Sequence, residues 1–127
     1  MAFDVVAGAG SLLSGTGVRF PHRWTSAGVS VDTEFTGGHL LHLAAAGCVL
    51  NDLYREADRL GIELAGVRVT ATGGFDTATW ASTGITYSVE LDSAATAEEL
   101  ERLLAVVDDV AEIPRALRAG PPVRRAP

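Results

Sequence analysis

The residues best suited to chemistry lie in the stretch TGGHLLHLAAAGCVLNDLY, residues 36–54, which has the chain's single cysteine, Cys48, near its centre. A thiolate is a nucleophile and a metal ligand, whereas a thiol enclosed by apolar side chains is inert. Cys48 is therefore either a small core residue or the functional centre of the protein. It lies about three turns inside a predicted helix, where the dipole of that helix is weak. Ionising the thiol therefore requires a nearby cation or hydrogen-bond donor.

Four neighbours share or adjoin the Cys48 side of this helix. At about 100° per residue, Leu41 and Ala44 lie on the same face, and Asn51 and Asp52 lie one turn further on. We expect Asn51 to be able to donate a hydrogen bond toward the sulfur. Asp52 opposes ionisation of the thiol if its carboxylate points the same way.

His39 and His42 are three residues apart, a workable spacing for two metal ligands on a helix. The remaining histidine, His22, is distant in the sequence, so the pattern predicts neither a metal nor another cofactor. His39 projects from the side of the helix opposite Cys48, and His42 lies about 120° away. A cysteine–histidine pair would therefore have to form across a packing interface.

Two arginines alternate with aromatic residues in VRFPHRW, residues 18–24. Arg19 and Arg23 are either part of a solvated strand face or a source of positive charge for the thiol of this or a second subunit. Arg115 and Arg118 leave the same two alternatives open.

The elements that must position these residues follow from local patterns. Residues 1–35 are strand-like and rich in turns, with candidate strands at 3–7, 18–24 and 29–35, and Pro21 places the second at an edge or bulge. Residues 36–60 form the central helix, with Thr36 as N-cap and Gly61 as terminator. Its second half is amphipathic and is expected to expose its charged residues, which are Asp52, Arg55, Glu56, Asp58 and Arg59.

The remainder of the chain predicts a hairpin and a helix. Two alternating runs within residues 65–92 indicate an antiparallel hairpin with a long tip. Thr96 and Glu99 have capping-box spacing at the start of a helix over residues 96–118, which Pro114 interrupts, and residues 119–127 form a tail. This order of elements predicts an α+β fold with two helices on one or two antiparallel sheets.

Composition limits the class of protein. The chain has 127 residues, 47% hydrophobic and 20% charged, as expected for one globular domain over residues 1–127. A net charge of −6 argues against nucleic-acid and anionic-membrane partners. One cysteine excludes an intrachain disulfide and fits a reducing cytoplasm. The sequence has neither the pattern of a signal peptide nor an apolar run long enough to span a membrane.

The run HLLHLAAAGCVLNDLYREADRLGIELAGVRVTATGGF, followed by ITYSVELDSAATAEELERLLAVVDDVAEIPRALRAGPPV, resembles the OsmC/Ohr family of organic hydroperoxide resistance proteins. The resemblance covers residues 36–123 and includes the first strands only by pattern. It implies an OsmC-like fold in an intertwined homodimer with a site at each subunit interface. It further implies that Cys48 is the peroxidatic cysteine, whose thiolate attacks the O–O bond of a hydroperoxide and becomes a sulfenic acid.

The sequence departs from the family pattern at three points. The position of the resolving cysteine falls on Ala111, and that of the glutamate early in the central helix falls on Gly38. The usual N-terminal arginine aligns near GAGS, residues 8–11, where none is present. Without a resolving cysteine, turnover depends on an external thiol that attacks the oxidised Cys48 directly.

Three functions remain open. The first is a one-cysteine, thiol-dependent reductase of organic hydroperoxides in the stress response. The second is a different enzyme on the same scaffold, which uses His39, His42 or an arginine for acid–base chemistry on a small apolar substrate. The third is a dimer that binds a hydrophobic ligand without catalysis, with Cys48 as a packing residue.

Overall fold

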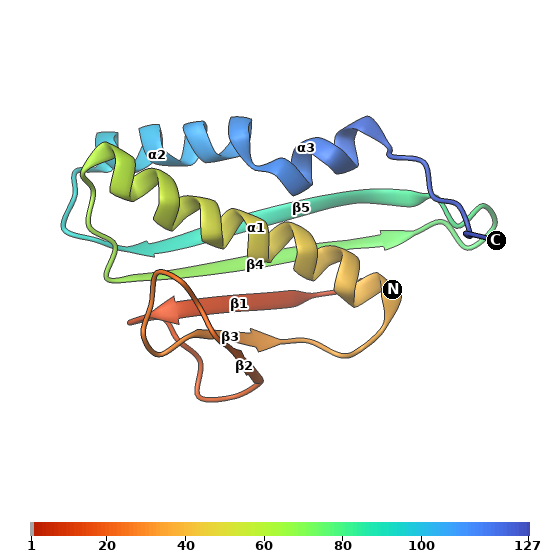
Figure 1. Ribbon diagram of the computed structural model, residues 1–127, viewed down its shortest axis with the longest axis horizontal. Coiled ribbons are helices and arrows are strands. Elements are labelled where there is room, and N and C mark those ends of the chain that lie inside the picture. The colour runs from red at the N-terminus through yellow and green to blue at the C-terminus, as the bar shows by residue number, and fades with distance from the viewer. Residues whose placement is uncertain (1) are drawn as a thin grey trace.

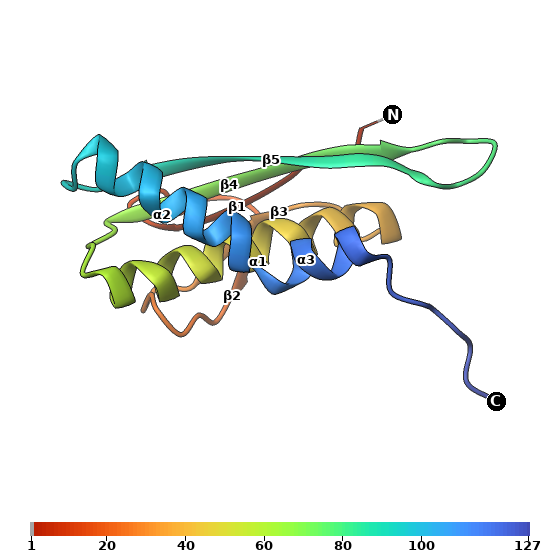
Figure 2. The same ribbon diagram turned by 90° about the horizontal axis from the view of Figure 1, so that it is seen from above.

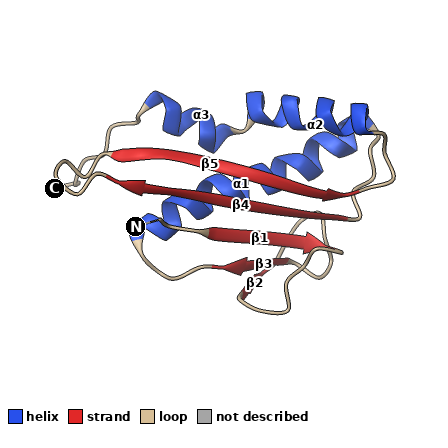
Figure 3. Ribbon diagram, turned by 180° about the vertical axis from the view of Figure 1, so that it is seen from behind, coloured by secondary structure: helices blue, strands red, loops and turns tan. Residues whose placement is uncertain are grey.

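The computed structural model describes residues 2–127, which form one antiparallel sheet covered on one face by helices (Figures 1 and 2). The sheet order is β2-β3-β1-β4-β5. Seen from behind, β4 and β5 pass in front of α1, and α2 and α3 lie along the β5 edge (Figure 3). The strands are β1 (Val5–Gly10), β2 (Val18–Phe20), β3 (Val29–Asp32), β4 (Gly66–Phe75) and β5 (Ser82–Asp92), and the helices are α1 (Gly37–Leu60), α2 (Ala97–Val110) and α3 (Glu112–Ala119).

The ends of α1 agree with the sequence prediction for residues 36–60. The hydroxyl of Thr36 accepts a hydrogen bond from the backbone N–H of His39 at 3.1 Å, which satisfies a donor of the first turn. Gly61 ends the helix in the left-handed conformation, with φ at 73°. The apolar side of α1 packs on β1 and β4, so the helix is held against the middle of the sheet.

Alternation along the long hairpin decides which face of the sheet is covered. In β4, Val67, Val69 and Ala71 are buried beneath the helices, whereas the residues between them are only half-buried. Arg68 is one of these and forms an ion pair with Glu90 of β5 on the open face. The two predicted alternating runs therefore form a hairpin within a single two-layer fold, as their period indicates.

The second and third strands are shorter than predicted, and the first lies at Val5–Gly10 instead of residues 3–7. β2 ends at Phe20, just before Pro21, because proline has no N–H with which to extend the strand ladder. Ser30 of β3 is buried although it faces the side expected to be solvated, since the loop after β1 folds over it. Its hydroxyl accepts from the N–H of Ser14 at 2.8 Å and donates to the carbonyl of Gly8 at 3.2 Å.

The predicted helix over residues 96–118 is two helices that meet at Ala111. Thr96 and Glu99 form the predicted capping box at the start of α2. The break precedes Pro114, with Ala111 in an extended conformation at ψ 118°. Pro114 therefore falls in the first turn of α3, where its missing N–H leaves no intrahelical bond unmade. No helix in residues 2–127 has the length and apolar character needed to cross a membrane.

Candidate functional site

Cys48 lies where the middle of α1 meets the start of α3. Its side chain is only 7% exposed. The thiol donates to Oδ2 of Asp52, one turn along α1, across 3.9 Å. The backbone N–H of Ile113, in the first turn of α3, acts on the sulfur as well and lowers the pKa of the thiol. The sulfur thus has a carboxylate neighbour on each of two helices, Asp52 on α1 and Glu112 on α3.

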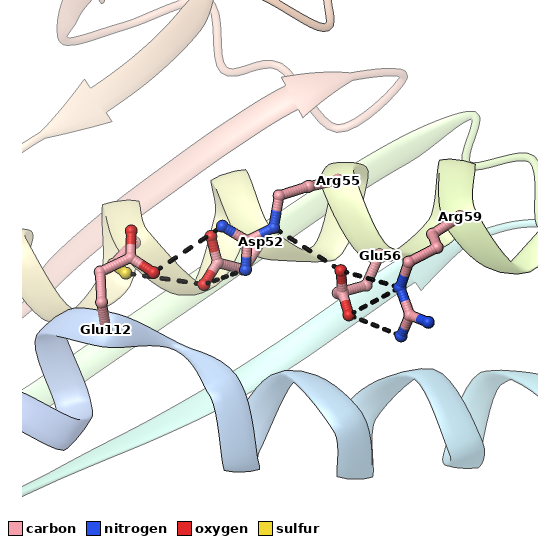
Figure 4. A network of polar contacts seen from close by, with 6 residues as sticks. Asp52, Arg55, Glu56, Arg59 and Glu112 are labelled. Carbon is pink, nitrogen blue, oxygen red and sulfur yellow. Dashed lines mark hydrogen bonds and ion pairs between the residues drawn. The ribbon is translucent and has the colours of Figure 1, made fainter.

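A network of alternating charges extends from the thiol along α1 (Figure 4). Nη2 of Arg55 lies 3.2 Å from Oδ2 of Asp52, and Nη1 lies 3.8 Å from Oε2 of Glu112. Nε of Arg55 also lies 3.6 Å from Glu56, which Arg59 contacts at 2.8 Å. Arg55 therefore connects the carboxylate next to the thiol with the first residue of α3.

The expectation that Asp52 and Glu56 are exposed is wrong. Asp52 is 2% exposed and Glu56 is also buried, whereas Arg55, Asp58 and Arg59 are exposed as predicted. The helices α2 and α3 pack against this side of α1 and cover the two carboxylates. Their burial is tolerated because each is paired with an arginine.

The surroundings of Cys48 favour the protonated thiol. Burial raises its pKa to about 11, with the negative charges of Asp52 and Glu112 as further causes. The N–H of Ile113 acts in the opposite direction by stabilising the thiolate, but it does not offset burial. At rest, the sulfur is a protonated thiol that donates to a carboxylate.

The pKa values of the two carboxyl groups next to the sulfur are shifted in opposite directions. Burial raises the pKa of Asp52 to about 6, although the nearby Arg55 favours its ionised form. The backbone N–H of Glu112 itself, at the start of α3, holds the pKa of that carboxyl below its usual value. Asp52 is therefore the group in this network that can exchange a proton near neutral pH.

The sulfur and one oxygen each of Asp52 and Glu112 lie within 4.8 Å of one another, a separation compatible with ligands of one metal ion. The guanidinium of Arg55 contacts both carboxylates, so a cation of the chain already balances their charge. The ion pairs with Arg55 explain why these two carboxylates lie close together, and no metal ion is needed to explain it.

Asn51 points away from the thiol. Its Oδ1 accepts from Nε2 of His22 at 2.9 Å, and His22 in turn contacts the hydroxyl of Thr25 at 2.7 Å. Asn51 is exposed on the other side of α1 and fastens the loop after β2 to the helix. The expected hydrogen bond from Asn51 to the sulfur is therefore not formed.

The two histidines at the start of α1 have structural partners. Nδ1 of His39 lies 2.6 Å from the hydroxyl of Thr36, at the N-cap. His42 is fully buried, donates from Nδ1 to the carbonyl of Gly38 at 2.6 Å, and stacks on Phe3. These contacts hold both histidines at the start of α1, next to Thr36, Gly38 and Phe3. The structure therefore brings neither histidine to Cys48.

Arg19 and Arg23 are also separate from the thiol within one chain. Nη1 of Arg19 donates to the carbonyl of Ala27 at 3.1 Å, and the guanidinium of Arg23 lies 5.8 Å from the centre of the Trp24 ring. The arginine that joins the thiol network is Arg55. Sequence reasoning missed it, although its position three residues after Asp52 is a recognisable ion-pair spacing.

Two cavities lie beside the first half and the middle of α1. One, of about 380 Å³, lies between α1 and the β2–β3 region and is called the β2 cavity; its lining is Phe20, Pro21, His22, Arg23, Trp24, Val29, Val31, Leu43, Ala44, Gly47, Leu50 and Asn51. The other, of about 310 Å³, is called the α3 cavity and lies between α1, β5 and α3. It is mostly apolar, and its lining is Leu41, Ala45, Ser82, Gly84, Ile85, Tyr87, Pro114, Leu117 and Arg118.

The α3 cavity lies on the thiol side of α1. Leu41, Ala45 and Cys48 follow one another at spacings of four and three residues, so they share one side of the helix. Pro114 lines the cavity, and it directly follows Ile113, whose backbone N–H lowers the pKa of the Cys48 thiol. An apolar compartment therefore lies one helical turn from the thiol.

A two-layer α+β fold with a cysteine on its central helix defines the class of protein, and comparison identifies the family. The sequence matches the model of the OsmC-like protein family over residues 30–125. The fold is similar to the crystal structure of an OsmC-like hydroperoxide resistance protein from Jannaschia sp. CCS1. That likeness has a TM-score of 0.64 at 10% sequence identity and covers 98% of this chain and 91% of the other.

No curated protein matches the sequence. The family match extends over most of the chain, so this protein belongs to the OsmC-like family. The resemblance noted from the sequence and the expected α+β, OsmC-like fold are confirmed.

Proposed function

We propose that this OsmC-like protein reduces small apolar organic hydroperoxides, with Cys48 as its reacting group. The observation that carries the proposal is an apolar cavity one helical turn from a thiol that donates to a carboxylate. The α3 cavity suits an alkyl or aryl group one turn away, and Asp52 accepts the thiol hydrogen bond. Family membership and the hydroperoxide resistance protein of similar fold support the same chemistry.

The proposed first step transfers the thiol proton to Asp52 as the sulfur attacks. A carboxyl with a pKa of about 6 is well suited to act as a base near neutral pH, and Arg55 orients it. The N–H of Ile113, at the start of α3, stabilises the developing negative charge on the sulfur. Proton transfer during attack compensates for the low thiolate population of a thiol with a pKa of about 11.

The sulfur attacks the terminal oxygen of the hydroperoxide, and the O–O bond breaks. Cys48 becomes a sulfenic acid, and the leaving alkoxide takes the proton from Asp52 to become an alcohol. Ala111 occupies the expected position of the resolving cysteine, so an external thiol attacks the sulfenic acid and releases water. A second external thiol then frees Cys48 from the mixed disulfide. A reducing cytoplasm supplies such thiols.

We propose that the working unit is the homodimer that the sequence resemblance implies. The side of α1 that carries Ala44, Gly47 and Asn51 lines the β2 cavity, and Ala44 and Asn51 are exposed there. Small residues on this side permit the close approach of a second copy of α1. Arg23 lines the same cavity, so the proposed dimer brings this arginine close to the α1 helix of the partner subunit.

The test is consumption of cumene hydroperoxide in the presence of dithiothreitol. We expect activity in the wild type, its loss in Cys48→Ser, and a reduced rate at pH 7 in Asp52→Asn. Ile85→Trp places a large ring toward the α3 cavity and should slow the reduction of cumene hydroperoxide more than that of hydrogen peroxide. Thr86→Trp, on the open face of the sheet, should change neither rate. Equal activity of Cys48→Ser and wild type would refute the proposal.

A ligand-binding protein without thiol chemistry is the second candidate, favoured by the burial of Cys48 and its raised pKa. It predicts that a small apolar ligand binds equally to the wild type and Cys48→Ser, without hydroperoxide consumption. If Ile85→Trp weakens this binding, the ligand lies in the α3 cavity.

A further inference from the structure

Tyr54, on α1, has a hydroxyl that the fold does not use. The residue is 7% exposed, and its hydroxyl oxygen is buried with no hydrogen-bond partner in the described part of the chain. Burying an unpaired hydroxyl costs free energy, and phenylalanine would provide the same ring without that cost. Burial also raises the pKa of Tyr54, so the group is a neutral phenol. Folding alone therefore does not explain this hydroxyl.

Tyr54 belongs to the wall of a cavity of about 460 Å³, called the Tyr54 cavity. It lies at the end of the molecule where α1 finishes and the α1–β4 and β5–α2 connections lie side by side (Figure 1). Two hydrogen bonds hold these connections together: Ser93 Oγ donates to the carbonyl of Glu63 at 2.6 Å, and Ala65 N donates to that of Asp92 at 2.7 Å. The cavity is lined by Trp24, Tyr54, Ala57, Asp58, Ile62, Glu63, Leu64, Ala65, Ser93 and Ala94.

The charged groups of this wall have one sign. Asp58 and Glu63 are exposed carboxylates with no ion-pair partner within residues 2–127, and none of the lining residues is Lys, Arg or His. Trp24 and Tyr54 add two aromatic rings. Trp24 already attracts one cation, because the guanidinium of Arg23 lies 5.8 Å from its ring centre.

We propose that the Tyr54 cavity binds a small organic cation, specifically a protonated alkyl diamine. The carboxylates of Asp58 and Glu63 pair with its ammonium groups, and Trp24 and Tyr54 contact its alkyl chain and charge. The hydroxyl of Tyr54 is enclosed in the ligand-free structure, so the ring turns toward the cavity on binding and the hydroxyl then accepts an N–H of the ligand. The ligand chemistry therefore accounts for the hydroxyl, the acidic wall and the aromatic pair together.

This site is separate from the thiol. Tyr54 is six residues after Cys48, which places the two side chains on different sides of α1. The Tyr54 cavity and the α3 cavity share no lining residue. Diamine binding is thus expected in Cys48→Ser as well as in the wild type, whether or not the protein reduces hydroperoxides.

The test uses the intrinsic fluorescence of Trp24 with putrescine as the probe. The chain has two tryptophans, and Trp80 lies on the hairpin tip, so Trp80→Phe leaves Trp24 as the only reporter. We expect a saturable change with putrescine and none with 1,4-butanediol, its uncharged analogue of similar length. Tyr54→Phe should weaken binding about tenfold while raising the Tm of the ligand-free protein. A purely structural role of the hydroxyl does not predict these opposite changes.

Asp58→Asn and Glu63→Gln should each weaken putrescine binding, whereas Glu101→Gln, an exposed carboxylate on α2, should leave it unchanged. The proposal is overturned if putrescine gives no saturable change up to about 10 mM, which corresponds to negligible affinity. It is equally overturned if Tyr54→Phe binds as tightly as its parent, or if Glu101→Gln weakens binding as much as the cavity variants.

Discussion

The sulfur of Cys48 lies 3.9 Å from Oδ2 of Asp52, and both side chains are buried between α1 and the start of α3. A thiol and a carboxyl group, each with a raised pKa, therefore face each other, and the guanidinium of Arg55 contacts the carboxyl group. The arrangement keeps the resting sulfur protonated and places a proton acceptor beside it.

The first prediction concerns the titration of Cys48. Thiolate absorbance in the ultraviolet should rise with a midpoint near pH 11, because burial and two carboxylates disfavour the charged sulfur. Glu112→Gln removes one negative charge next to the sulfur and should lower this midpoint, while Glu101→Gln on α2 should not. Alkylation by iodoacetamide at pH 8 should accelerate several-fold in Glu112→Gln only. A wild-type midpoint below pH 8.5 would contradict the expected effect of burial.

The second prediction concerns the stability contributed by Asp52. Its pKa is raised from 3.8 to about 6 in the folded protein, so ionising it costs stability above pH 6, and this cost disappears below about pH 4. Asp52→Asn removes a cost of roughly 2–3 kcal/mol at pH 7.5 and should therefore stabilise the protein there. Urea unfolding at pH 7.5 and pH 4 measures the difference. A destabilised Asp52→Asn at pH 7.5 would show that the ion pair with Arg55 outweighs the burial of the charge.

The third prediction concerns the contact between α1 and the sheet at Gly73. A Cβ at this position would lie far inside van der Waals distance of the carbonyl of Gly84 and of Nε2 of His42. Gly73→Ala should therefore destabilise the protein by about 2–4 kcal/mol, because the strand and the buried histidine must separate. Gly15→Ala, in an open loop, should change stability by less than about 0.5 kcal/mol. Thermal unfolding of both variants makes the comparison.

The fourth prediction concerns the proposed dimer. A Cβ at Gly47 meets no atom within 4 Å in the single chain, so a larger side chain is sterically acceptable in a monomer. If two copies of α1 pack at Ala44 and Gly47, Gly47→Glu should separate them. Light scattering after size exclusion should then give the mass of two chains for the wild type and of one for Gly47→Glu. Ala105→Glu, exposed on α2, should remain a dimer. A single-chain mass for the wild type would argue against the dimer.

Local sequence patterns predicted most of the fold. The N-cap at Thr36, the terminating Gly61 and the capping box at Thr96 are interactions among neighbours in the chain, and the structure contains all three. The alternating runs of the hairpin were predicted because side chains of a strand alternate between its faces. The break at Ala111, three residues before Pro114, was predicted less well, since a proline is tolerated within the first turn of a new helix.

The sequence by itself determined the elements, the position of Cys48 on an apolar helix and the family resemblance, because these depend on residue types and short spacings. Only the tertiary structure decided what surrounds the sulfur. The burial of Asp52, the approach of Ile113 and the turn of Asn51 toward His22 all result from packing between segments far apart in the chain. The same packing sets the protonation of the thiol, since a pKa depends on the burial and charge around the group and not on its neighbours in the sequence.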